Sequence, residues 1–154
     1  MSDWKRTTKE VPFESLPPEM VSIIQRHIEQ YNLGDILSDT LMCIQTDSEK
    51  VKKGLFGKAE TVRLGAVVTP RWLIWTIEGT KTDPIVLSAQ LIDITVQDYA
   101  QTQFAKLVAD SGIEVSGRFT DASENASAFL GLEEGPLAEK FKEVVIKAAA
   151  AAKK

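Results

Sequence analysis

The sequence predicts a domain of the α+β class that is mostly β, with about seven antiparallel strands, a C-terminal helix and an N-terminal helical extension. Three observations support this class. From about residue 37 the apolar side chains repeat with a period of two, whereas both ends of the chain repeat with a helical period. The turns between the predicted strands are too short for the crossover that parallel strands require. With 154 residues, the chain is long enough for one domain with a sizeable core.

Residues 1–36 form the predicted N-terminal extension. Residues 1–14 are mixed and polar, so we expect them to form a loose arm. A helix is predicted to begin at Pro17-Pro18, because proline is preorganised for the first turn of a helix. The apolar residues of this helix recur at helical spacing and form one stripe that must dock on another element; they are Met20, Ile23, Ile24, Ile28 and Tyr31.

Residues 37–150 contain the predicted strands and the second helix. Alternating or β-prone segments separated by turn residues place the strands within residues 37–46, 61–68, 67–79, 85–99, 113–120 and 128–132. The segment 85–99 is long enough for two short strands or one bent strand. Residues 97–111 fit either a short helix or an irregular excursion.

The final helix is predicted to begin at Gly135-Pro136. Its one apolar face suits it to plug the open end of a curled sheet, and that face carries Leu137, Phe141, Val144, Val145 and Ala148. Glu133 and Glu134 precede the helix, where negative charge complements the helix dipole. We expect residues 151–154 to form a frayed tail.

Two tryptophans lie three residues apart in the predicted strand within 67–79. Because side chains alternate along a strand, Trp72 and Trp75 must point to opposite faces of the sheet and cannot form one aromatic cage. Both faces of this strand are apolar, so the second face needs a cover from the N-terminal helix, the final helix or another copy of the chain. One tryptophan is therefore a core residue. Both are candidate interface residues, since tryptophan often anchors protein contacts.

Composition and charge exclude several classes of function. The formal net charge is −4, which argues against a general nucleic-acid-binding protein. Cys43 is the single cysteine, so no intrachain disulfide can form, and we expect a buried, inert thiol in a reducing cytoplasm. The N-terminus has no apolar signal region, and no apolar run is long enough to span a bilayer.

No pattern of residues predicts an active site, a metal or a cofactor. His27 is the sole histidine, and it is expected at the boundary or surface of its helix, without partners for metal binding or nucleophilic catalysis. Gly131 and Gly135 frame an acidic pair that would repel phosphate. We therefore expect a protein that is not an enzyme, with a small enzyme of unrecognised site as a remaining alternative.

Two motifs resemble the bacterial type of pleckstrin-homology-like domain over residues 37–150. They are Lys53-Gly54-Leu55-Phe56-Gly57, in the loop after the first predicted strand, and Val68-Thr69-Pro70-Arg71-Trp72-Leu73-Ile74, at the step into the third. The resemblance implies a barrel or sandwich of about seven strands capped by a C-terminal helix. It also implies a scaffold that binds phosphoinositides, peptides or proteins, often as an oligomer.

The loop at residues 50–58 is the candidate ligand or membrane loop. It carries Lys50, Lys52, Lys53 and Lys58 together with Leu55 and Phe56. The lipid-binding signature of the family requires a basic residue where Glu60 stands, which argues against specific phosphoinositide binding. Two interpretations remain for the loop. In the first, it supports weak, salt-sensitive binding to anionic lipid. In the second, Leu55 and Phe56 pack against the rest of the domain or contact a neighbouring subunit.

From these observations we expect a non-enzymatic binding or assembly module. A protein partner or a homo-oligomer is favoured over anionic lipid, and neither nucleic acid nor a cofactor is expected.

Overall fold

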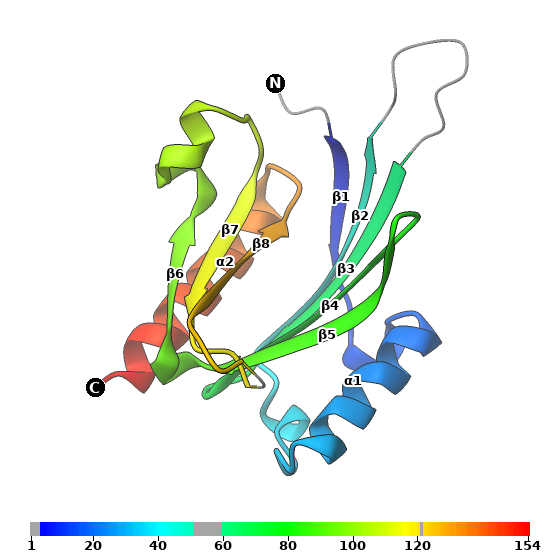
Figure 1. Ribbon diagram of the computed structural model, residues 1–154, viewed down its shortest axis with the longest axis vertical. Helices are drawn as coiled ribbons and strands as arrows, with labels where there is room; N and C mark the ends of the chain where they lie inside the picture. The colour runs from blue at the N-terminus through cyan, green and yellow to red at the C-terminus, as the bar shows by residue number, and fades with distance from the viewer. Residues whose placement is uncertain (1–3, 51–59, 121) are drawn as a thin grey trace.

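The computed structural model describes residues 4–50, 60–120 and 122–154. Its architecture is two antiparallel sheets and two α-helices (Figure 1), which confirms the mostly-β α+β class. The first sheet has strand order β1-β2-β3-β4-β5, and the second has the order β6-β7-β8. Their bounds are β1 Trp4–Glu10, β2 Met42–Lys50, β3 Glu60–Val68, β4 Trp72–Gly79, β5 Thr82–Gln90, β6 Ile94–Asp98, β7 Gly112–Gly117 and β8 Ala126–Gly131. The helices are α1 Pro18–Gln30 and α2 Pro136–Ala152. No closed barrel is formed by these strands.

The expectation of a loose N-terminal arm is wrong, because Trp4–Glu10 is the edge strand β1. It pairs antiparallel with β2, from Trp4 opposite Lys50 to Glu10 opposite Ile44. The segment has few apolar residues to reveal an alternation, so its strand character depends on the partner that β2 supplies. The described part of the chain therefore has eight strands, one more than expected.

The other strands follow the sequence pattern with shifted ends. The segment 85–99 contains two strands, β5 and β6, joined by a short 3₁₀ turn at Leu91–Asp93. Residues 97–111 form an irregular excursion with 3₁₀ turns at Tyr99–Gln101 and Gln103–Lys106, not a longer helix. At the start of the first predicted strand, Leu37–Asp39 is also a 3₁₀ turn.

The main core lies between the two sheets and against α2. Trp75 is fully buried there and meets Phe119 edge to face, with ring centroids 5.2 Å apart. From α2, Phe141 and Val145 enter the same core, as the apolar stripe of the final helix predicted. The helix contacts strands of both sheets, so it covers one side of the space between them.

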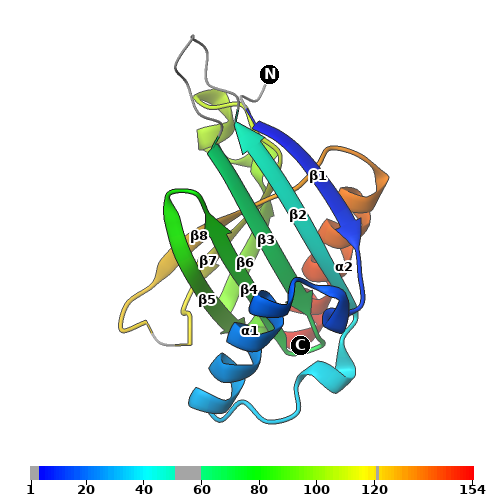
Figure 2. The same ribbon diagram turned by 90° about the vertical axis from the view of Figure 1, so that its right-hand side faces the viewer.

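The helix α1 packs on the outer face of the first sheet, the face that points away from the second sheet (Figure 2). Its buried residues Met20 and Ile24 contact Cys43, Val67 and Ile74 in a second, smaller core. Of the three possible covers for the second face of β4, the structure therefore shows the N-terminal helix.

The close approach of α1 depends on a glycine in β3. A Cβ added at Gly65 would lie 3.2 Å from the Met20 sulfur, tighter than most contacts of this kind. Gly65 therefore lets the helix lie directly on the sheet. Neither helix in the described ranges has the combination of length and apolar character needed to cross a bilayer.

Candidate functional site

The half of the outer face that α1 leaves uncovered forms a groove of about 800 Å³, which we call the outer-face groove. All five strands of the first sheet contribute to it. Alternation explains which side chains point there: Gln45, Asp47 and Glu49 follow Cys43 at two-residue steps along β2, and Cys43 faces α1. The groove therefore continues the surface on which α1 docks.

The outer-face groove carries more negative than positive charge. Its acidic lining residues are Asp47, Glu49, Glu78 and Asp83, and its basic ones are Lys5 and Arg63. Threonines from β1, β3 and the β4–β5 turn add hydroxyl groups along its walls. Such a surface is suited to a cationic, hydrogen-bonding partner.

Arg63 ties the floor of the groove to α1. Its guanidinium donates to the Glu19 carboxylate at 2.5 Å and also contacts the Glu78 carboxylate. Partial burial lowers the pKa of Arg63, but the hydrogen bonds and charges of Glu19 and Glu78 outweigh it, so the pKa is raised overall. The pKa of Glu19 is lowered, first by a hydrogen bond from its own backbone at the start of the helix and then by Arg63. Arg63 is thus held as a structural cation whose charge is already compensated.

The structure locates only part of the predicted ligand loop. Lys50 ends β2, with its ammonium nitrogen 5.9 Å from the centre of the Trp4 ring. The other predicted loop residues lie outside the described residues; they are Lys52, Lys53, Leu55, Phe56 and Lys58. Lys50 directly follows Glu49, which lines the outer-face groove.

The side chains of Trp72 and Trp75 lie on opposite faces of the first sheet, as their spacing predicted. Trp75 has no exposed surface, so the expectation that it contributes to an interface is wrong. Trp72 is partly buried against the α1 core and lines a separate pocket of about 470 Å³ with Tyr31 and Arg118. Only Trp72 could therefore reach a partner.

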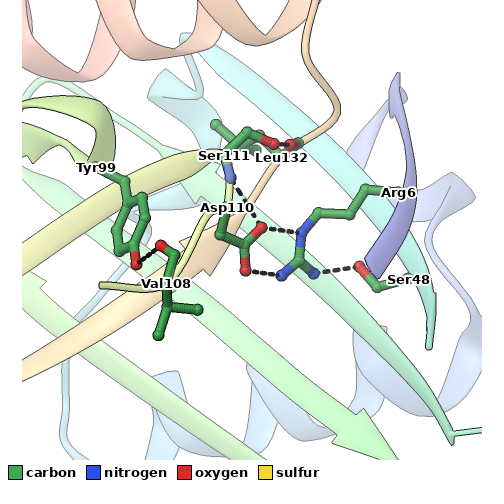
Figure 3. A network of polar contacts seen from close by, with 7 residues as sticks. All are labelled: Arg6, Ser48, Tyr99, Val108, Asp110, Ser111 and Leu132. Carbon is green, nitrogen blue, oxygen red and sulfur yellow. Dashed lines mark hydrogen bonds and ion pairs between the residues drawn. The ribbon is translucent and has the colours of Figure 1, made fainter. Parts of the chain in front are cut away.

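A buried ion pair between β1 and the β6–β7 loop was not predicted from the sequence (Figure 3). The Arg6 guanidinium donates to both Asp110 carboxylate oxygens, at 3.0 and 2.6 Å, and to the Ser48 hydroxyl at 2.6 Å. The Arg6 and Asp110 side chains are each only 10% exposed. The rings of Trp4 and Phe129 lie 5.2 and 5.5 Å from the guanidinium carbon. This network joins the two sheets at the end of the molecule opposite α1.

Glu133 also holds β1 in place. Its carboxylate accepts a hydrogen bond from the Thr8 backbone N–H at 2.9 Å, and its own N–H donates to the Thr8 hydroxyl at 2.8 Å. The Glu133 carboxylate, whose charge complements the dipole of α2, therefore also accepts a hydrogen bond from the backbone of the edge strand β1.

The expectation that His27 lies at a boundary or surface is wrong. His27 is buried against β5, where its Nε2 is 2.7 Å from the Ser88 hydroxyl. Ser88 in turn lies 2.5 Å from the Thr120 hydroxyl. Ser88 is only 1% exposed, so the pair ties α1 to the sheet and offers no accessible nucleophile.

Cys43 is buried and free, which confirms the expectation that its thiol is buried. Burial raises the pKa of Cys43 to about 12, and the charges of Glu14 and Glu10 add to the effect. Within the described ranges, no three His, Cys, Asp or Glu side chains are grouped to hold a metal ion.

Comparison with known proteins adds no relative: no family model, no curated protein and no solved structure matches this chain.

Proposed function

We propose that this protein is a non-enzymatic binding module of the pleckstrin-homology-like type whose outer-face groove receives a positively charged segment of a protein partner. The order of elements supports the type: the seven strands β2 to β8 are followed by α2, and β1 and α1 precede them as an extension. The observation that carries the binding role is the groove itself, where four acidic residues face two basic ones.

The charge of the groove selects the partner. Arg63 is compensated by Glu19 and Glu78, so Asp47, Glu49 and Asp83 dominate the remaining field against Lys5. Lysine or arginine side chains of an extended partner would meet these carboxylates, and the threonine hydroxyls would bond its polar groups.

Two groups that often act in catalysis, a cysteine thiol and a histidine ring, are both buried in this chain. Cys43, the single cysteine, is buried with a raised pKa, and His27, the single histidine, contacts a buried serine. A nucleophile or a general base needs access to its substrate, which neither group has.

Fluorescence anisotropy with labelled hexalysine and hexaglutamate peptides tests the proposal. Hexalysine should bind the full chain, and binding should weaken as salt rises because exposed charges are screened. The double variant Asp47→Asn/Glu49→Gln should weaken hexalysine binding by about three- to tenfold, since each exposed ion pair contributes up to about 1 kcal/mol.

Glu124→Gln provides the matched control, because Glu124 is an exposed carboxylate in the β7–β8 loop, outside the groove. It should leave hexalysine binding within about twofold of wild type. Equal losses in the control and the double variant, or preferential binding of hexaglutamate, would show that the groove is not the binding site.

A further inference from the structure

The loop between β6 and β7 exposes three large apolar side chains. Phe104 is 61% exposed, Leu107 83% and Val108 62%. They lie on and directly after the 3₁₀ turn Gln103–Lys106, and we call them the apolar tip. No other segment of the described chain exposes three large apolar side chains so close together in sequence.

The apolar tip is held in place by polar contacts at the base of its loop. The Tyr99 hydroxyl donates to the Val108 carbonyl oxygen at 2.6 Å, Asp110 pairs with Arg6, and the Ser111 hydroxyl donates to the Leu132 carbonyl oxygen (Figure 3). The backbone N–H groups of Leu107 and Val108 both donate to the Phe104 carbonyl oxygen, at 3.0 and 2.9 Å. The apolar tip is therefore exposed on an ordered loop, whose base is held by contacts from residues before and after the tip.

The charge around the tip is positive or neutral. Residues 99–109 contain no acidic residue and one basic residue, Lys106, although 26% of the whole chain is charged. The two flanking aspartates are compensated: Asp98 lies 3.2 Å from the Lys142 ammonium group and Asp110 lies 2.6 Å from the Arg6 guanidinium. An anionic surface would thus meet no uncompensated negative charge at the loop that could repel it.

The β6–β7 loop, which carries the tip, lies at the end of the molecule where β1 begins and β2 ends, as both views show (Figures 1 and 2). The Arg6–Asp110 pair fixes this proximity. On the same side of the sheet as Arg6 lie Trp4 and Lys50, whose ammonium group approaches the Trp4 ring. The acidic groove residues Asp47 and Glu49 alternate to the opposite face.

We propose that the apolar tip inserts into the surface of a lipid bilayer that contains anionic lipid, with Lys106 and Lys50 at the level of the headgroups. A small convex protrusion suits a fluid bilayer, whereas a stable protein interface requires about 1,000 Å² or more, which three side chains do not provide. Tryptophan and lysine beside an apolar insertion are typical of groups that lie at the membrane–water interface. This surface is separate from the outer-face groove, so either proposal stands or fails without the other.

Co-sedimentation of the full chain with vesicles tests the proposal. The vesicles are phosphatidylcholine alone and phosphatidylcholine with 30% phosphatidylserine. Wild-type protein should partition onto the mixed vesicles, and Leu107→Asn and Phe104→Asn should each lower the partition coefficient by roughly tenfold or more. Lys106→Gln should lower it about fivefold on mixed vesicles and have little effect on neutral ones.

Leu41→Asn is the matched control. Leu41 is 50% exposed and precedes β2, at the opposite end of that strand from Lys50, so its loss should leave vesicle binding unchanged. Circular dichroism of each variant verifies that it is folded, as expected for substitutions of exposed side chains.

The proposal is overturned if wild-type protein does not bind mixed vesicles, or if Leu41→Asn reduces binding as much as Leu107→Asn. Light scattering gives the competing outcome. A concentration-dependent dimer that Leu107→Asn abolishes, with no vesicle binding, would assign the apolar tip to contacts between copies of the chain.

Discussion

At the scale of single residues, Arg6 connects three separate segments of the chain. It bonds Asp110 from the β6–β7 loop and Ser48 from β2, and its guanidinium lies near two aromatic rings. A Cβ at Gly131 would lie 2.5 Å from the Arg6 guanidinium, so the glycine of β8 makes room for it. A buried charge of this kind is stable only while its partner is present.

Removing the partner of Arg6 should therefore be costly. Asp110→Asn should lower the free energy of unfolding by about 3–5 kcal/mol, because it leaves an uncompensated charge in a largely buried site. Urea denaturation measures the loss. The double variant Arg6→Met/Asp110→Leu should recover most of it, since an apolar pair avoids the cost of desolvating two charges. A loss below about 1 kcal/mol in Asp110→Asn would show that water compensates Arg6.

The thiol of Cys43 predicts a pH dependence of stability. The folded chain keeps the Cys43 proton up to a pKa of about 12, whereas an exposed cysteine thiol, as in the unfolded chain, has an ordinary pKa of 9.0. Between these values the folded state binds more protons, so the stability contributed by the thiol falls as pH rises. From pH 8 to pH 10, the advantage of wild type over Cys43→Ala in unfolding free energy should shrink by about 1.4 kcal/mol. Urea titrations of both proteins at the two pH values measure it; an unchanged difference would contradict the raised pKa.

At the scale of elements, α1 and β1 illustrate two ways of fastening an N-terminal segment. The helix is held by apolar contacts from Met20 and Ile24. The Arg63–Glu19 ion pair adds an exposed polar contact and His27–Ser88 a buried one. The strand β1 is held mainly by ladder pairing and polar contacts, of which Thr8–Glu133 is one. Only a segment that is held by apolar contacts, such as α1, shows a hydrophobic pattern in the sequence.

The stability of the α1–sheet contact should depend on its buried apolar stripe. Met20→Ala should lower the free energy of unfolding by about 2–5 kcal/mol, because it leaves a cavity above Gly65 in a fully buried site. The control Gln25→Ala, at an exposed position of the same helix, should change stability by less than about 0.5 kcal/mol. Thermal and urea unfolding compare the two. Equal effects would mean that helix propensity, not docking, determines the contribution of α1.

At the scale of the whole molecule, the two proposed surfaces occupy different sides. Lys5 and Arg6 are neighbours on β1, yet alternation sends Lys5 to the outer-face groove and Arg6 toward the loop that carries the apolar tip. A bilayer at the tip would therefore leave the groove accessible to a protein partner. The excursion between β6 and β7 makes this possible, because it reaches the end of the molecule where β1 begins (Figures 1 and 2).

The sequence predicted the pattern of elements better than the site. The period-two segments, the helix at Met20 and the opposite faces of Trp72 and Trp75 are confirmed, because hydrophobic periodicity is a local property. The strand β1 and the burial of His27 were missed, since both depend on partners distant in the chain. The outer-face groove could not be predicted either, because it brings Asp47 and Asp83 together from separate strands.

What the sequence alone determined is the class of the fold: a mostly antiparallel β domain with an amphipathic helix near each end, specified by the spacing of apolar side chains. What only the tertiary structure decided is which polar groups meet. The Arg6–Asp110 pair, the acid excess of the groove and the fastening of the apolar tip each join residues that strand pairing and sheet packing bring together. Periodicity determines which face of an element is buried, whereas register and packing determine what that face touches.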